Sequence, residues 1–217
     1  ICFSYALQDV SEHWSSEVLQ KWISLDLLKG DANGIRRDDF VTRAEFVTFI
    51  NRVFNFEKLS SESFPDVSPK KWYAAEISKA YYAGIIEGDE KGNMLPESPI
   101  SRQEAAVMLA RAFKLKPQDV KAFEEFSDSG QIATWAQEAV SVMKEKGFII
   151  GRGNNSFVPL DKTTRAEAVV MINKAMGRLI NEAGTYSGES TGNVVVSVKD
   201  VILENMVIGG NLYLTPR

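Results

Sequence analysis

The feature that most constrains the fold is an internal repeat present in three copies. In each copy a Trp is followed 16 residues later by a Gly, and then, 13 or 14 residues further on, by the Arg of a Ser/Thr-Arg-x-Glu segment. The copies are Trp14, Gly30 and 42–45; Trp72, Gly88 and 101–104; and Trp135, Gly151 and 164–167. Such self-similarity indicates one structural unit that recurs along the chain.

The Ser/Thr-Arg-x-Glu segments predict three helix starts. In each, a hydroxyl residue is followed three places later by Glu and then by an apolar run, which is the pattern of a capping box. The apolar stripes are Phe46, Phe49, Ile50 and Val53; Ala105, Met108, Leu109 and Ala112; and Ala168, Met171, Ile172 and Ala175. A second helix is predicted between each Trp and Gly, ending near a left-handed residue at Asp26, Gly84 or Gly147. The predicted fold class is mainly α, with three helix-loop-helix repeats that must pack together to form a core.

An arginine follows the hydroxyl residue of every segment, at the first helical position: Arg43, Arg102 and Arg165. A cation there gains nothing from the helix dipole, and the neighbouring N–H groups have no partner within the helix. The pattern therefore indicates an anion near each Arg. From the residues alone, that anion is either a ligand or a protein carboxylate, supplied by the Asp of an upstream Phe-x-Asp segment or by the Glu that ends the same Ser/Thr-Arg-x-Glu segment.

Three further residue types recur at equivalent places. The tryptophans start helices, so core packing is the first expectation and stacking on a sugar the second. The glycines predict turns, or a close approach to a ligand. The aspartates are expected as N-caps that could also orient the arginines. These candidate site residues are Trp14, Trp72 and Trp135; Gly30, Gly88 and Gly151; and Asp9, Asp66 and Asp128.

Composition excludes several classes of protein. The net charge of −4 argues against a general nucleic-acid binder, and no apolar run approaches the roughly 20 residues of a membrane span. A single cysteine (Cys2) and a single histidine (His13) make a zinc site and a Ser-His-Asp set improbable. A calcium loop is suggested at 31–34, but the matching loop 151–155 has no acid. No metal site and no cofactor are therefore expected.

The C-terminal part differs from the repeats in composition and in sequence pattern. Residues 185–192 are rich in Ser, Gly and Thr and read as a linker, whereas residues 193–214 are β-like and resemble rungs of a parallel β-helix. So few rungs cannot bury themselves. They either pair with the helical part or belong to a chain that continues beyond Arg217, and continuation is favoured. The expected domains are repeats at 1–59, 60–122 and 123–184, and a β-rich region at 185–217.

The second copy resembles the S-layer homology repeat. The resemblance lies in Phe64-Pro65-Asp66-Val67, Trp72-Tyr73-Ala74, Gly84-Ile85-Ile86-Glu87-Gly88 and Ile100-Ser101-Arg102-Gln103-Glu104. The third copy matches nearly as well. The first copy departs most, because Asp26 replaces a glycine, its loop is one residue shorter and its loop proline is missing. The resemblance extends over about residues 3–182.

The resemblance implies a triplet of such repeats from a bacterial cell-surface protein. Such triplets form a pseudo-threefold helical spindle that anchors proteins of Gram-positive and related bacteria to the wall. They bind secondary cell wall polysaccharide through its pyruvylated N-acetylmannosamine unit, in grooves between repeats, with the motif Arg as a main contact. The chain is thus expected to be a secreted, cell-wall-bound monomer with internal pseudo-threefold symmetry and no catalytic role within these residues.

Two further expectations follow. Arg102 and Arg165 have intact settings, whereas Arg43 belongs to the copy with the shortened loop and is expected to be the weakest site. The alternative function is the anchor part of a larger surface enzyme that acts on polysaccharide and has a β-helix catalytic domain. Residues 185–217 offer no catalytic set of their own.

Overall fold

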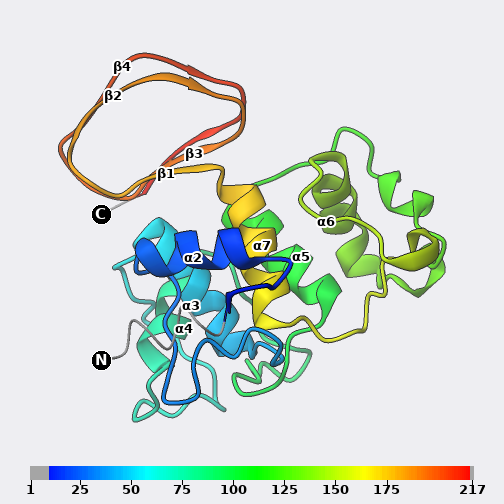
Figure 1. Cartoon of the computed structure of the whole chain (residues 1–217). Helices are drawn as coiled ribbons and strands as arrows, with labels where there is room; N and C mark the ends of the chain where they lie inside the picture. Colours follow the sequence, from blue (N-terminus) through cyan, green and yellow to red (C-terminus); the bar gives the residue numbers. More distant parts are fainter. Residues whose placement is uncertain (1–9, 216–217) are drawn as a thin grey trace.

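Within the described residues, the two helices predicted for each repeat are present. A computed structural model of the chain describes residues 10–215. Its helices are α2 (Ser16–Ser24) and α3 (Arg43–Phe54), α4 (Ala74–Tyr82) and α5 (Arg102–Ala112), and α6 (Thr134–Glu145) and α7 (Arg165–Met176), with short 3-10 turns at Ala122–Glu125, Ser129–Gln131 and Gly153–Asn155 (Figure 1). Within residues 10–215, no helix combines the length and the apolarity that crossing a membrane requires.

The three predicted capping boxes are present. The Thr42 hydroxyl accepts a hydrogen bond from the Glu45 N–H at 3.2 Å, while the Glu45 carboxylate accepts one from the Thr42 N–H at 2.9 Å. The same reciprocal pairs form at the starts of α5 and α7. The first helices of the repeats end on left-handed residues, with φ of 56° at Asp26, 71° at Gly84 and 67° at Gly147. Local sequence signals therefore determine where α3, α5 and α7 begin and where α2, α4 and α6 end.

Helices α3, α5 and α7 pack against one another at the centre of the helical part, and every residue of the three predicted stripes is buried. Each central helix also carries an outer helix from a different repeat: α4 packs on α3, α6 on α5 and α2 on α7 (Figure 1). The outer helix of a repeat thus covers the inner helix of the copy before it, and the first copy covers the third.

Backbone hydrogen bonds just before the capping boxes link all three repeats. The Val41 N–H donates to the Thr163 carbonyl, Thr163 to Ile100, and Ile100 back to Val41, each at 3.0 Å. The first N–H groups of each central helix donate to the loop of another repeat, as from Arg43 to the Ser98 carbonyl at 3.0 Å. Loop carbonyls therefore satisfy the helix-start N–H groups that the sequence left without partners.

The C-terminal part forms parallel strands, in agreement with its β-like sequence. Strands β1 (Arg178–Ile180), β3 (Val194–Val196) and β5 (Leu212–Leu214) form one parallel sheet, and β2 (Gly184–Ser190) pairs in parallel with β4 (Val201–Ile208). Figure 1 shows these strands as stacked flat coils at the end of α7. The linker predicted at 185–192 is wrong, because most of it is β2 and its polar side chains lie on an exposed strand.

The coils pack directly on the helical part. Val195 is fully buried in the main hydrophobic core, and the Tyr213 hydroxyl donates to the Phe113 carbonyl at 2.8 Å. The Asn193 amide donates to the Ala175 carbonyl at 2.7 Å. Of the two alternatives for burying the strands, pairing with the helices is thus present in the structure.

Candidate binding grooves

Three grooves combine residues of all three repeats. Each is lined by the motif Arg of one copy, by the recurring Gly and the capping-box Glu of the next copy, and by the recurring Trp of the copy after that. We number the grooves by the copy that supplies the loop. Groove 1 has Arg165, Gly30, Glu45 and Trp72; groove 2 has Arg43, Gly88, Glu104 and Trp135; and groove 3 has Arg102, Gly151, Glu167 and Trp14. Their volumes are about 120, 360 and 430 Å³.

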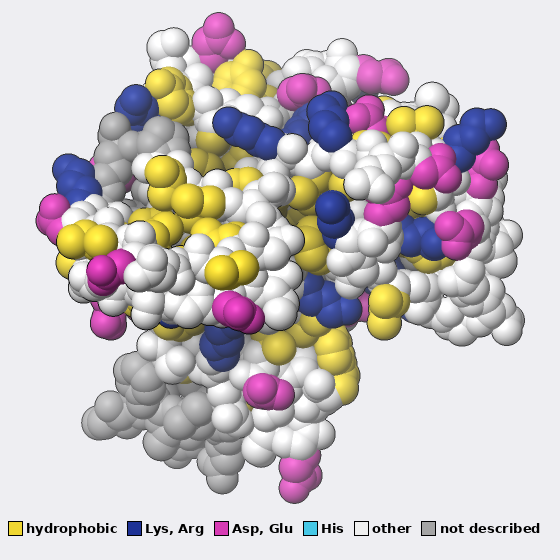
Figure 2. Space-filling model, turned by 90° about the horizontal axis from the view of Figure 1, so that it is seen from above, with side chains coloured by type: hydrophobic (Ala, Val, Ile, Leu, Met, Phe, Trp, Pro, Cys, Tyr) yellow, Lys and Arg dark blue, Asp and Glu magenta, His cyan; other side chains and the backbone are white. Residues whose placement is uncertain are grey.

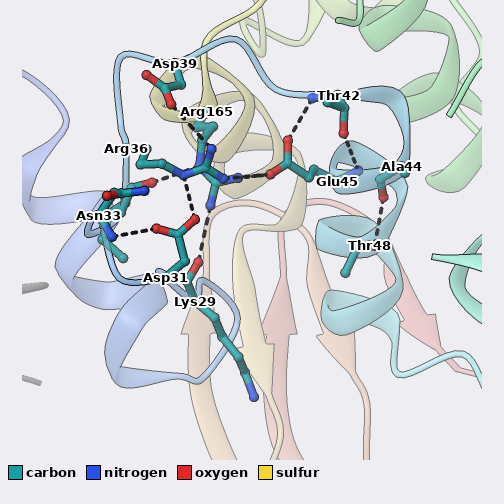
Figure 3. Close-up of polar contacts among 11 residues, drawn as sticks. Lys29, Asp31, Asn33, Arg36, Asp39, Thr42, Ala44, Glu45, Thr48 and Arg165 are labelled. Atoms are coloured by element: carbon teal, nitrogen blue, oxygen red, sulfur yellow. Dashed lines mark hydrogen bonds and ion pairs between the residues drawn. The ribbon is translucent and has the colours of Figure 1, made fainter. Parts of the chain in front are cut away.

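The motif arginines are buried and bind the neighbouring repeat. In groove 1, Arg165 Nε donates to the Ile35 carbonyl at 2.8 Å. Its Nη1 donates to Glu45 at 2.6 Å (Figure 3). Arg43 makes the matching contacts in groove 2, with the Met94 carbonyl at 2.7 Å and Glu104 at 2.5 Å. In groove 3, Arg102 makes the matching contacts with the Phe157 carbonyl and with Glu167. The side chains keep only 4–10% of their surface exposed.

These contacts decide between the protein carboxylates that the sequence left open. The partner is neither the upstream Asp nor the Glu of the same segment, but the capping-box Glu of the following repeat. Burial lowers the pKa of Arg165, and the Glu45 carboxylate opposes this shift. Each motif Arg therefore joins two repeats in addition to lining a groove.

The tryptophans disagree with the first expectation. They are not core residues, because 66% of Trp14, 62% of Trp72 and 59% of Trp135 is exposed. Each of these exposed rings lines one of the three grooves. The fully buried tryptophan is instead Trp22, whose indole N–H donates to Asn173 at 3.3 Å.

The recurring glycines allow each loop to fold tightly. A Cβ at Gly88 would lie 2.8 Å from backbone atoms of Gly92, and one at Gly30 would lie 2.6 Å from the Gly34 carbonyl oxygen. At Gly151 the same atom would meet Asn155 at 2.8 Å. Each glycine lies just before the turn of its loop, where close packing requires it, and contact of these glycines with a ligand stays a prediction.

The aspartates do not cap the following helices, so that prediction is wrong where it can be checked. The Asp66 carboxylate accepts the N–H groups of Met94 and Leu95 at 2.9 and 2.7 Å. Asp128 accepts those of Phe157 and Val158, both at 2.7 Å. They hold the loop that supplies the carbonyl for the motif Arg. Asp9 lies outside the described residues.

The shortened loop belongs to a different arginine from the one expected. Because each Arg binds the loop of the following copy, the short loop of the first copy faces Arg165 in groove 1, and Arg43 faces the intact second loop. Groove 1 is also the smallest groove. Arg36 lies beside Arg165 there and contacts Asp31 at 3.1 Å and Glu45 at 3.2 Å (Figure 3).

The grooves differ in charge as well as in size. The lining of groove 2 carries two cations, from Arg43 and Arg111, and four carboxylates. Groove 3 is lined by three cations and one carboxylate, and groove 1 is lined by four cations and two carboxylates. Over the face seen in Figure 2, side chains of both charges are interspersed.

Sequence reasoning missed two arginines, Arg36 and Arg152, that share the capping-box carboxylates in grooves 1 and 3. No shared sequence pattern identifies them, because they occupy different positions in their loops, directly after the buried Ile35 and directly after Gly151.

A Ser-His-Asp chain that composition made improbable is present at the start of α2. His13 Nδ1 lies 2.6 Å from the Ser15 hydroxyl, and Nε2 lies 3.2 Å from Asp38. Ser15 is only 2% exposed, which is unsuited to attack on a bound substrate. These hydrogen bonds join the start of α2 to the loop before α3, and we assign them a structural role.

Comparison with known proteins agrees with the repeats. The model of the S-layer homology domain matches residues 7–47, 63–106 and 125–169. An amylopullulanase of Thermoanaerobacterium thermosulfurigenes is 34% identical over 176 residues, and an exoglucanase of Acetivibrio thermocellus is 34% identical over 175; each match covers 78% of this chain. A surface-layer 125 kDa protein of Lysinibacillus sphaericus is 26% identical over 167 residues, or 75% of this chain. The matches span only 9%, 16% and 14% of those relatives.

Proposed function

Because the chain belongs to the S-layer homology domain family, whose domains anchor proteins to the cell wall, we propose that its grooves bind the pyruvylated N-acetylmannosamine unit of secondary cell wall polysaccharide. The observation that carries this proposal is the recurrence of an Arg, a tight glycine loop and an exposed Trp in three grooves. A pyruvyl ketal bears a carboxylate, for which guanidinium is a planar, multidentate donor. An exposed indole offers a flat apolar face to the sugar ring.

A pseudo-threefold monomer, divided into repeats at 1–59, 60–122 and 123–184, would give three grooves related by rotation. The closed ring of hydrogen bonds through Val41, Ile100 and Thr163 supports this arrangement. So does the regular shift by one copy between each Arg, its loop and its Trp. A pseudo-threefold spindle, which the resemblance implies, accounts for both the ring of hydrogen bonds and the shift by one copy.

Weak individual grooves would be sufficient for retention. If one groove bound its sugar with a millimolar dissociation constant, the binding free energy would be roughly 4 kcal/mol. Engagement of a second groove by a dense polymer would raise retention by a factor on the order of 100 or more. Catalysis is not needed for such an anchor.

Cosedimentation with purified cell walls tests the proposal. Walls that carry the pyruvylated polymer should pull the protein down, and walls treated with mild acid to remove the pyruvyl ketals should not. Calorimetry with the monosaccharide and its non-pyruvylated form should show the same preference. Equal binding to both forms would remove the carboxylate from the proposal.

A larger surface enzyme is the second candidate for the protein that carries this anchor. Its support is the similarity to relatives named amylopullulanase and exoglucanase, of which this chain matches a small part. We propose in addition that β1–β5 are the first coils of a parallel β-helix, since equivalent strands stack in parallel at intervals of 16 to 18 residues.

A further inference from the structure

Two arginines share a single carboxylate in groove 3. Arg152 Nη2 lies 2.5 Å from Oε1 of Glu167, and its Nη1 lies 2.8 Å from Asp161. The motif residue Arg102 reaches the same Glu167 oxygen only at 3.6 Å. In the other two grooves the motif Arg holds its Glu at 2.5 and 2.6 Å. Arg152 has therefore taken the carboxylate that a motif Arg otherwise uses.

The outcome is an excess of positive charge at the base of the groove. Burial lowers the pKa of Arg102, and the neighbouring charge of Arg152 lowers it further. Two guanidinium groups that compete for one carboxylate oxygen are stabilised by any additional anion that both can reach. Lys174 also lines this groove, which has about 430 Å³ of space beside the exposed ring of Trp14.

We propose that groove 3 is the site that selects for the carboxylate of an acidic sugar, and that Arg152 is the residue that determines this selectivity, beside Arg102. The inference rests on the proposed function and names its principal groove. Arg152 keeps 40% of its side chain exposed, so a ligand can reach it. Groove 2 has an excess of carboxylates that repels an anion, and groove 1 has the least space.

Calorimetry with pyruvylated N-acetylmannosamine and with its non-pyruvylated form tests this assignment. The measured quantity is the ratio of the two dissociation constants. Arg152→Gln should reduce the preference for the pyruvylated sugar by about 10- to 100-fold, the effect of losing one charge-assisted hydrogen bond. Affinity for the neutral sugar should not change, which separates loss of charge from loss of loop structure. Arg152→Lys should retain part of the preference.

Arg178→Gln is the control, because it removes the same charge from an arginine that lines none of the three grooves and lies over the Tyr186 ring. This control should leave the ratio unchanged. If the wild-type protein prefers the pyruvylated sugar and Arg152→Gln keeps the full preference, the inference is overturned while the proposed function stands. If the wild-type protein has no preference, the proposed function fails and the inference fails with it.

The indole N–H signals of the tryptophans in an NMR spectrum identify the groove directly. Addition of the pyruvylated sugar should shift the Trp14 signal first. A first shift at Trp135 or Trp72 would assign the sugar to groove 2 or groove 1 and overturn the inference.

Discussion

The motif arginine has a structural role that its position on the helix conceals. A cation at a helix start is unfavourable by itself, yet the guanidinium of Arg43 is held by a carbonyl of one loop and by Glu104 of another helix. Both partners come from the repeat that follows. The contacts with the next repeat thus offset the unfavourable position of the cation at the helix start.

Replacing Arg43 by Ala should therefore reduce stability. The change leaves the Met94 carbonyl and the Glu104 carboxylate without their donor, and removal of one partner from a largely buried pair costs about 2 to 4 kcal/mol. The control is Arg111→Ala, which breaks an exposed pair with Glu87 and should cost less than about 1 kcal/mol. Urea unfolding measures both. Equal losses would show that burial of Arg43 does not strengthen its contacts.

Asp128 gives the fold a dependence on pH. Burial raises the pKa of Asp128, but hydrogen bonds from the Phe157 N–H, the Ser156 side chain and the Val158 N–H outweigh it, and the pKa is lowered overall. A lowered pKa means that the folded state favours the carboxylate. Its contribution to stability is present above the unfolded-state pKa, about 3.9, and is lost as the pH falls through the folded value.

Asp128→Asn should thus be less stable than the wild type at pH 6, and this difference should shrink as the pH is lowered from about 5 to 2.5. The free energy of unfolding of both proteins, measured across this range, gives the comparison. A difference that stayed constant with pH would mean that the ionised carboxylate is not what stabilises the loop.

At the scale of elements, the loops between the paired helices determine the shape of each groove. The first loop reaches its buried residue Ile35 five residues after Gly30, whereas the others take six to reach Met94 and Phe157. The tight turn after each Gly places backbone atoms so close that a Cβ has no space. Loop length and glycine therefore act together.

Gly88→Ala should destabilise the protein by about 1 to 3 kcal/mol, since the added methyl would lie 2.8 Å from Gly92 backbone atoms that cannot rotate away. Gly130→Ala is the matched control, because nothing lies within 4 Å of its Cβ position. That substitution should be neutral or slightly stabilising. Thermal unfolding of the two variants should separate them clearly, and similar melting temperatures would contradict the close packing.

Local structure could be predicted from the sequence because the signals are local. Capping boxes, apolar stripes and left-handed helix ends each depend on residues a few positions apart, and all three capping boxes formed. Which copies become neighbours is a different question. Periodicity shows that repeats are alike without showing that Arg165 meets the loop of the first copy, so the shortened loop was assigned to Arg43.

The tryptophans show the same limit. A Trp at a helix start has the same sequence pattern whether it faces the core or a groove, and the outcome depends on which helix of another repeat covers that face. Trp22, which belongs to no repeated pattern, is the one that the core encloses. The chain Ser15–His13–Asp38 likewise required contact between segments 25 residues apart.

At the scale of the whole molecule, the parallel coils and the helices share one apolar junction. The Tyr213 ring meets Phe113 edge-on at 5.2 Å and Phe54 at 6.0 Å, and its hydroxyl binds a helix-end carbonyl. Val195 of the middle strand lies in the same core as the central helices. The coils are thus packed on the helical part through this junction.

Tyr213→Ala should release this junction. The variant loses two edge-on ring contacts and a partly buried hydrogen bond, so the free energy of unfolding should fall by about 2 to 3 kcal/mol. Strand β3, which contains Val195, lies between β1 and the strand β5 that contains Tyr213. Loss of the Tyr213 contacts should therefore accelerate amide hydrogen exchange throughout β3 and β5 and change it little in α3. The control is Leu214→Ala, whose side chain is 67% exposed and should have little effect. If Tyr213→Ala accelerated exchange in α3 as much as in the strands, the helices would depend on the coils for their own stability.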